Sequence, residues 1–257
     1  MKKIGLIGEK LSHSVSPELH ALFGDYEYRL YEISPIDLPS FLNHCELDGM
    51  NVTIPYKKMV IPFCSALSAK AAKIGAVNTL LRVNDGWYGE NTDYDGFAFL
   101  LKRAGLYDEI SKQKTLILGS GGASAAAQAV IEDAGGETAV VSRGGILRYG
   151  NIEEQGDAAF LVNTTPVGMY PKMDASPLDL RRLPHLRAVV DVIYNPKMTI
   201  LLRQAESLGI PAYGGFPMLV SQAKAAAELF SEKKIADEKI DAVLMKDLFF
   251  SCNDGNG

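Results

Sequence analysis

The chain has 257 residues, of which 47% are hydrophobic and 22% are charged, and its formal net charge at pH 7 is -5. This composition is typical of a folded globular protein with one large domain or two domains of ordinary size, and it excludes a mostly disordered chain. The acidic balance, without a long basic run, lacks the electrostatic signature of a protein that binds nucleic acid.

The cysteines and the N-terminal residues indicate a cellular compartment. Cys45, Cys64 and Cys252 form no CxxC pair and have no histidine at metal-ligand spacing, which favours reduced thiols and predicts no metal site. The apolar stretch before Glu9 is too short for the core of a signal peptide, and no apolar run approaches the length of a membrane span. We therefore expect a cytoplasmic protein with no membrane or nucleic-acid partner, either a monomer or a homodimer.

The first part of the chain alternates strands with short helices. Hydrophobic periodicity predicts strands over residues 4–8, 28–33 and 50–54 and helices over 17–23 and 35–44. A further helical stretch near 66–74 precedes two strands, in "AVNTLLRV" and "WYGEN", and then a helix over about 94–104.

A second alternation of strands and helices follows. Its strands are "TLILG", "TAVVSR", "AFLVNTT", "AVVDVIY" and a short piece near 211–213, with helices over 123–134 and 198–208. Two more helices, over 218–231 and 237–250, precede a polar tail, "NDGNG", that we expect to be mobile. The patterns predict an α/β fold with two domains, and the last helices must pack on one of them.

A glycine-rich turn opens the second alternation. Gly119, Gly121 and Gly122 lie between a strand and an alanine-rich helix, an arrangement that lets a pyrophosphate approach backbone N–H groups at a helix N-terminus. A plain strand-to-helix turn would also use glycine. The next strand ends in Ser142 and Arg143, where a site that prefers NAD usually has an acidic residue, so Arg143 favours NADP by pairing with its 2′-phosphate. The alternative is an ordinary surface arginine.

The stretch "NVTIPYKK" breaks a local rule. Its first half favours a strand, and Pro55 suits the first position of a following helix. Lys57 and Lys58 would then lie in the first turn, where the helix macrodipole disfavours cations. Broken local rules tend to mark function, although two solvated surface lysines would also explain the pattern.

Several polar residues of the first part and of the last long helix are candidates for a ligand site. Ser14 and Ser16 share one face if the segment is extended, which suits a carboxylate ligand, but Ser16 would also serve as a helix cap. Asn78 lies in a strand-like run, where a buried amide needs partners such as a ligand hydroxyl, and Asp93 is also a candidate helix cap. Gln222 lies on an apolar helical stripe and is either a ligand contact or a satisfied core glutamine. The other members of that stripe are Met218, Ala225 and Leu229.

Nine stretches, in this order, resemble the shikimate dehydrogenase family over nearly the whole chain: "SHSVSP", "NVTIPYK", "GAVNT", "NTDYDGF", "GSGGAS", "SR", "NTTPVGM", "DVIYNP" and "GFPMLVSQA". The resemblance implies an α/β protein with a substrate-binding domain, residues 1–96 and 218–257, and a Rossmann-like, doubly wound NADP-binding domain, residues 97–217. The C-terminal helices are expected to return to the substrate domain. The implied activity is that of an oxidoreductase of the shikimate pathway, which leads to aromatic amino acids: reversible NADPH-dependent reduction of 3-dehydroshikimate to shikimate.

The resemblance also implies roles for individual residues. Lys57 and Asp93 form the catalytic pair, in which Lys57 faces the cleft and Lys58 is ordinary surface. Hydride delivery to a carbonyl carbon creates an alkoxide, which a nearby cation or acid stabilises and protonates. An approximate helical wheel agrees, since it buries Tyr56, Met59, Val60 and Phe63 and leaves Lys57 at the flank of that stripe.

The remaining implied roles concern substrate and cofactor. Ser14 and Ser16 bind the substrate carboxylate, Tyr194 lines the cleft near the reacting centre, and the ring hydroxyls contact Thr53, Asn78 and Gln222. The residues expected to contact NADP(H) are Gly119, Ser120, Gly121, Gly122, Ala123, Ser142, Arg143, Asn163, Thr164 and Gly215.

The chain departs from the family pattern in its second half. Gly144 stands where members typically have threonine, and only about 20 residues separate Arg143 from Asn163, so the adenine side is shortened. Gly214 and Pro217 replace an aspartate and a glycine that are usual there, and the usual proline is missing beside Glu9 and Lys10. Two alternatives therefore stay open: a relative that also accepts quinate or NAD, and a non-catalytic NADP-binding protein on the same fold.

Overall fold

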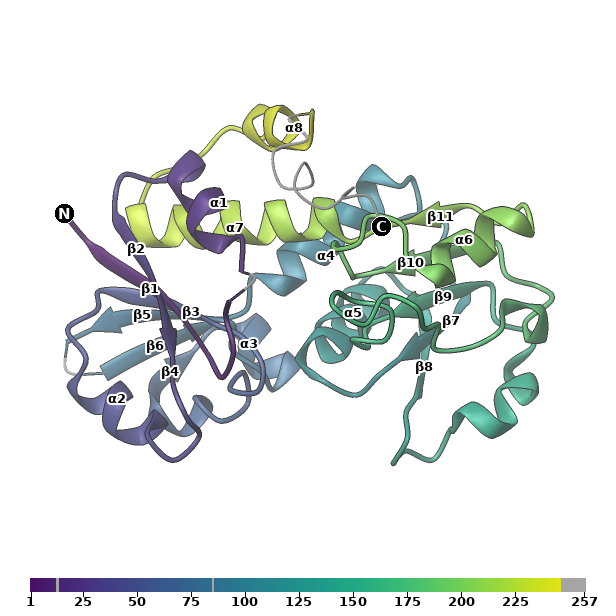
Figure 1. Ribbon diagram of the computed structural model, residues 1–257, viewed down its shortest axis with the longest axis horizontal. Helices are drawn as coiled ribbons and strands as arrows, with labels where there is room; N and C mark the ends of the chain where they lie inside the picture. The colour runs from purple at the N-terminus through teal and green to yellow at the C-terminus, as the bar shows by residue number, and fades with distance from the viewer. Residues whose placement is uncertain (13, 85, 246–257) are drawn as a thin grey trace. The chain divides into compact units, whose positions relative to one another are not determined.

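The computed structural model describes residues 1–12, 14–84 and 86–245. The chain divides into two compact units, one of Met1–Asp95 with the chain from Val220 onward and one of Gly96–Leu219. Each unit contains its own β-sheet (Figure 1). Among the described residues, no helix is both long enough and apolar enough to cross a membrane.

The first unit contains a mixed six-stranded sheet in the order β2-β1-β3-β5-β6-β4. Its strands are β1 (Lys3–Gly8), β2 (Glu27–Glu32), β3 (Gly49–Val52), β4 (Cys64–Leu67), β5 (Thr79–Val83) and β6 (Gly86–Glu90). Strands β2, β1 and β3 are parallel, because helices α1 (Ser16–Phe23) and α2 (Leu38–His44) provide the crossovers. Strands β5 and β6 form an antiparallel hairpin beside β3. The predicted β-α-β-α-β start of the chain is confirmed.

Apolar side chains fill both faces of this sheet. One face carries a cluster that includes Met50, Leu80 and Trp87, together with the short helices α3 (Ala69–Ile74) and η1 (Ile61–Phe63). On the other face, Ala226 and Phe230 of α7 pack against Ile4 of β1, and α7 lies beside α1 (Figure 1). The two C-terminal helices are α7 (Phe216–Ser231) and α8 (Glu238–Met245). From Val220 onward they belong to the first unit, as the expected fold requires.

The second unit contains a five-stranded parallel sheet in the order β11-β10-β9-β7-β8. Its elements are α4 (Asp93–Arg103), which enters it from the first unit, β7 (Lys114–Leu118), α5 (Gly122–Asp133), β8 (Glu137–Val141), η2 (Tyr149–Gln155), β9 (Phe160–Asn163), η3 (Leu180–Arg182), β10 (Ala188–Asp191), α6 (Ile200–Ser207) and β11 (Ala212–Tyr213). From β7 the chain first crosses to β8 on one side and then to β9 on the other side of β7, as in doubly wound sheets. The topological switch point therefore lies between β7 and β9. Ligands of such sheets bind outside the carboxyl ends of the strands at this point.

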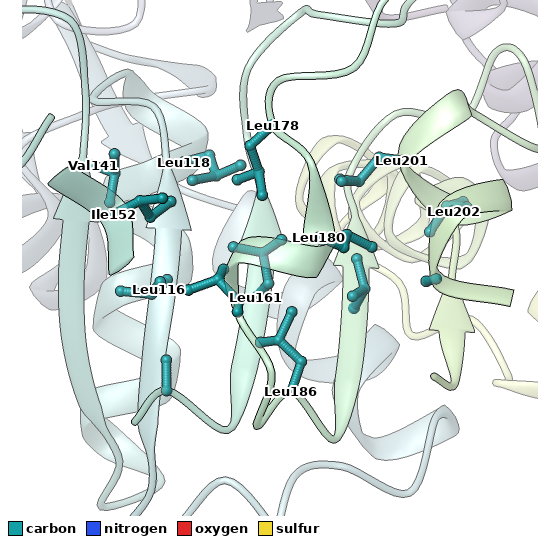
Figure 2. Packing of buried hydrophobic residues seen from close by; sticks show 14 residues of the cluster. Leu116, Leu118, Val141, Ile152, Leu161, Leu178, Leu180, Leu186, Leu201 and Leu202 are labelled. Atoms are coloured by element: carbon teal, nitrogen blue, oxygen red, sulfur yellow. The ribbon is translucent and has the colours of Figure 1, made fainter. Parts of the chain in front are cut away.

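A leucine-rich layer covers one face of the second sheet. Figure 2 shows Leu116 of β7 and Leu161 of β9 meeting Leu180 and Leu186 of the segment that crosses them, with Leu201 of α6 beside them. The sequences of these strands are continuous apolar runs, because the side chains on both faces of a covered parallel sheet are buried. The layer includes Leu118, the last residue of β7, which directly precedes the glycine-rich turn.

Two predicted elements differ from the structure. Residues 64–67 are strand β4, which pairs in parallel with β6 at the sheet edge, so the helix expected from 66 begins only at Ala69. Edge pairing overrode the local helical pattern here. The last predicted helix is α8 as far as Met245, and residues 246–250, Cys252 and the "NDGNG" tail lie outside the described residues. Cys45 and Cys64 are half-buried free thiols.

Replacing Leu161 with alanine should destabilise the protein by about 2–5 kcal/mol, because the substitution removes fully buried apolar volume from the centre of the leucine layer. Chemical denaturation followed by far-UV circular dichroism measures the loss. Leu208→Ala is the matched control, since Leu208 is 45% exposed and such surface changes stay within about 0.5 kcal/mol. Equal losses in the two variants would contradict this account of the core.

Candidate active site

Lys57 and Asp93 form an ion pair in the first unit. The Lys57 ammonium Nζ donates to Asp93 Oδ2 at 2.6 Å, and the two side chains are 18% and 8% exposed. Such a pair contributes modestly to stability, because desolvation of both charges offsets their attraction. The pair matters for geometry, because it holds the Lys57 ammonium in one orientation at the edge of a buried region. The structure therefore brings the two predicted catalytic residues together.

The segment that carries Lys57 is not a helix, so that expectation is wrong. Residues 54–60 form consecutive turns, and the main-chain carbonyl of Lys57 accepts from the Val77 N–H at 2.7 Å instead of from its own segment. The macrodipole argument about the lysines therefore does not apply. The helical wheel is right that Tyr56 and Val60 are buried but wrong for Met59, which is 42% exposed. Lys58 is exposed, as expected.

Asn78 holds Asp93 from the other side. Its side-chain Nδ2 donates to Asp93 Oδ1 at 2.9 Å and to Thr92 Oγ1 at 3.0 Å, and its Oδ1 accepts the Thr92 backbone N–H at 2.7 Å. The amide is buried, and both of its protons are used within the protein. Asn78 therefore fixes the first residue of α4, and a contact from its amide to a ligand would require one of these bonds to be exchanged.

The serine segment is not extended, in contrast to our expectation. Val15 has φ -91° and ψ 9°, which lies outside the β region, and it occupies the N-cap position of α1. Ser16 is therefore the first helical residue and not the cap that was the alternative. The Ser14 hydroxyl accepts from the Ser16 N–H at 3.3 Å, and both serines are half-buried. His13 lies outside the described residues.

The other expected substrate residues are distributed between the units. Thr53 follows β3 and is half-buried, and its N–H donates to the Ile7 carbonyl at 3.0 Å. Gln222 is half-buried in α7. Of the predicted apolar stripe, Met218 is buried, whereas Ala225 and Leu229 are only half-buried, and the fully buried residues of the helix include Ala223 and Phe230. Tyr194 belongs to the second unit, where burial raises the pKa of its hydroxyl.

The glycine-rich turn joins β7 to α5 in the second unit. Gly119 has φ +107°, a conformation that favours glycine, and a Cβ there would lie 2.8 Å from Thr164 Oγ1. Gly121 is the N-cap of α5, where no described side chain caps the helix and where a Cβ would meet open space. The uncapped amides of α5 therefore face an accessible surface near Ser120, which suits an anion such as a phosphate.

The neighbouring strand ends carry the other expected cofactor residues. Ser142 and the exposed Arg143 follow β8. Burial raises the pKa of the nearby Tyr149 hydroxyl, and the positive charge of Arg143 opposes part of that rise. Residues 149–155 form the 3-10 segment η2 in place of a full helix, in keeping with the shortened adenine side. Gly215 is required by packing, since a Cβ there would lie 2.0 Å from the Val192 carbonyl oxygen.

Asn163 and Asp191 form a buried polar centre at the carboxyl ends of β9 and β10. Asn163 Nδ2 donates to Asp191 Oδ1 at 3.0 Å, while its Oδ1 accepts from the Thr165 hydroxyl at 2.7 Å. Asp191 Oδ2 accepts from the Thr199 hydroxyl at 2.8 Å. Because Asn163 is fully buried and bonded, its side chain shapes the loop that contains Thr164.

Sequence reasoning missed the polar residues around Asn78. Asn51, Thr79 and Thr92 are buried and bonded to one another or to Asn78. A signal existed in the sequence, since asparagine inside a strand-like run is unusual, as in "MNVTI". Periodicity alone does not show which of these side chains point toward the same place.

Asp191→Asn should change how stability depends on pH. Burial raises the pKa of the Asp191 carboxyl to about 6, against three hydrogen bonds that favour the charged form. The folded state therefore binds this proton more tightly than the unfolded state does. As the pH rises from about 4 to 7, wild type should lose roughly 1–3 kcal/mol relative to Asp191→Asn. Denaturant titrations of both proteins across this range measure the difference, and a constant difference would contradict the assignment.

Comparisons with known proteins agree on one family. The family described as "Shikimate dehydrogenase substrate binding domain" matches residues 6–80. The shikimate dehydrogenase (NADP(+)) of Clostridium beijerinckii is 37% identical over 93% of this chain and 95% of that one. The structure of shikimate dehydrogenase 1 from Peptoclostridium difficile has a TM-score of 0.88, with 34% identity over 98% of this chain and 99% of that one. The shikimate 5-dehydrogenase of Thermus thermophilus, solved in complex with NADP(H) and shikimate, has a TM-score of 0.84, with 31% identity over 96% and 100% of the two chains. The resemblance expected from the motifs is confirmed, and the chain belongs to the shikimate dehydrogenase family.

Proposed function

We propose that this chain is an NADP-dependent shikimate dehydrogenase, which reduces 3-dehydroshikimate to shikimate with NADPH and runs in reverse with NADP. The names of relatives that match over more than nine tenths of both chains support this function. One structural observation carries the chemistry: a partly buried lysine bonded to a buried aspartate at 2.6 Å. The broader quinate or NAD enzyme and the non-catalytic binding protein are not favoured.

The reaction divides between cofactor and protein. When bound, NADPH supplies a hydride to the carbonyl carbon of the substrate. The Lys57 ammonium then stabilises the alkoxide that develops and gives its oxygen a proton. In the reverse direction neutral Lys57 accepts the hydroxyl proton. A proton donor fixed by an aspartate lowers the barrier further, because less reorganisation is needed at the moment of transfer.

Asp93 orients Lys57 in this proposal. One carboxylate oxygen accepts from Lys57 and the other accepts from Asn78, so rotation of the carboxylate breaks at least one bond. The Lys57 side chain has many rotamers of its own, and the restraint removes most of them before the substrate arrives.

We assign substrate binding to the first unit and cofactor binding to the second, close to residues 1–96 with 218–257 and residues 97–217. Ser14, Ser16, Thr53 and Gln222 would contact the substrate carboxylate and hydroxyls, together with Asn78, and Tyr194 remains a predicted substrate-binding residue. The domain description of the matched family, which spans residues 6–80, supports the first assignment.

The residues present fit NADP(H). The uncapped N-terminus of α5 at Gly121 would hold the pyrophosphate, with Gly119 keeping the turn tight enough for close approach. Arg143 would pair with the 2′-phosphate, and Ser142 would lie beside it. The other contacts of this proposal are Ser120, Gly122, Ala123, Asn163, Thr164 and Gly215. The reduced thiols inferred from the sequence support a cytoplasmic enzyme. Its substrate would be a small molecule, and the enzyme would be a monomer or a homodimer.

Lys57→Met should lower kcat for shikimate oxidation by about 100-fold or more, because the general acid-base group is lost. Lys58→Met is the matched control, since Lys58 is the exposed neighbour, and it should retain wild-type turnover. Initial rates of nicotinamide reduction, with shikimate and quinate each crossed with NADP and NAD, measure both the activity and its specificity. Full turnover by Lys57→Met would remove its catalytic role, and turnover of quinate or use of NAD would identify the broader enzyme.

Arg143→Ala should raise KM for NADP about tenfold or more, because one charge-assisted contact to the 2′-phosphate is lost, while KM for NAD changes little. The control is Arg203→Ala, at an exposed position of α6 in the same unit. Steady-state kinetics at saturating shikimate give both constants. An unchanged KM for NADP would show that the phosphate is recognised elsewhere.

A further inference from the structure

A continuous row of hydrogen bonds in the first unit ends on Asp93. The Tyr28 hydroxyl donates to Asn51 Oδ1 at 2.9 Å, and Asn51 Nδ2 donates to Thr79 Oγ1 at 3.1 Å. The Thr79 hydroxyl donates to Asn78 Oδ1 at 3.1 Å, and Asn78 Nδ2 donates to Asp93 Oδ1 at 2.9 Å. The row links four elements of the first unit, from β2 through β3 and β5 to the start of α4.

Every bond in this row points toward the carboxylate. The orientation of the Asn78 amide is fixed, because the Thr92 backbone N–H needs an acceptor and finds Asn78 Oδ1 at 2.7 Å. The orientation of Asn51 follows from its second donation, to the main-chain carbonyl of Asn78 at 3.4 Å. Thr79 Oγ1 therefore accepts from the Asn51 amide, and the row continues through the shorter of its two other contacts, 3.1 Å to Asn78 Oδ1 against 3.4 Å to Thr92 Oγ1. Hydrogen bonds aligned in one direction polarise and strengthen one another, and an anion is the natural end of such a row.

The row is built into the core. Asn51, Thr79 and Asn78 are all buried, where an unpaired polar group would be costly. At its start, Tyr28 stacks on the buried ring of His20, with centroids 4.1 Å apart.

We propose that Thr79 is a positioning residue for the catalytic pair. Its hydroxyl accepts from Asn51 and donates to Asn78, and it thereby holds Asp93, and through Asp93 also Lys57, in the reactive orientation. This inference rests on the proposed function, because it needs Lys57 and Asp93 to be the catalytic pair. Thr79 lies one residue from Asn78 and bonds Asp93 only through that amide. Its loss should therefore affect the chemical step more than substrate binding.

Thr79→Val and Thr79→Ser separate the hydroxyl from the shape of the side chain. Valine keeps the shape and loses the donor, so kcat should fall about tenfold or more while KM for shikimate stays within about twofold. Serine keeps the donor and loses a methyl group, so kcat should stay within about threefold of wild type even though thermal stability drops. A structural role alone predicts the opposite order, in which valine is tolerated and serine is not.

Matched controls come from elsewhere in the chain. Thr115 is fully buried in β7 of the second unit, and its hydroxyl has no partner among the described residues, so Thr115→Val should leave kcat unchanged. Tyr28→Phe removes the first donor of the row and should lower kcat about threefold or more. Tyr26→Phe is its control, because the Tyr26 hydroxyl bonds His20 Nδ1 outside the row.

The experiment measures kcat, KM for shikimate and thermal midpoint for these variants, with wild type and Lys57→Met alongside. The positioning role is overturned if Thr79→Val has wild-type kcat, or if Thr79→Ser and Thr79→Val lose kcat equally. In either case the proposed function remains intact if Lys57→Met is inactive. If Thr79→Val does not fold, the comparison of Tyr28→Phe with Tyr26→Phe decides, and equal kcat values for the two overturn the proposal. Absence of turnover by wild type with any substrate and cofactor pair overturns both proposals.

Discussion

The buried amide of Asn78 is the constraint on which the candidate active site depends. It accepts a hydrogen bond from the Thr92 main-chain N–H and donates one to the Asp93 carboxylate. The end of the segment that joins β6 to α4 and the first residue of α4 are therefore held next to the start of β5. Lys57 lies on a turn segment with no helix of its own and takes its direction from Asp93. One amide thus decides where a flexible ammonium points, because a planar group with fixed donors and acceptors leaves its partners little rotational freedom.

The second unit achieves a comparable result with backbone geometry. In its doubly wound sheet the parallel strands β7, β8 and β9 end on the same side. The glycine-rich turn, Arg143 and Thr164 follow these strand ends and therefore lie on that side. The turn leaves the amides of α5 uncapped and accessible, while Asn163 and Asp191 brace the adjoining loops from within. A charged cofactor needs such fixed dipoles, because mobile side chains would have to be ordered when it binds.

Strands and helices with strong periodicity were predictable from the sequence, and the errors have a common cause. Strand β4 forms because β6 offers an edge to pair with, and the turns at 54–60 form because Val77 takes the carbonyl of Lys57. Val15 departs from the extended conformation at the start of α1. In each case the local pattern was ambiguous, and a partner distant in sequence or a helix boundary decided the outcome.

The sequence by itself determined the family, the α/β architecture and the identity of the residues proposed for catalysis, because ordered short motifs and apolar periodicity are properties of the chain alone. Only the tertiary structure decided which polar groups are partners. Lys57 and Asp93 are 36 residues apart, Asn163 and Asp191 are 28 apart, and Thr79 meets Asn51 from a neighbouring strand. Hydrogen bonds act over about 3 Å, so such pairs are defined by strand order and register, which no short stretch of sequence contains.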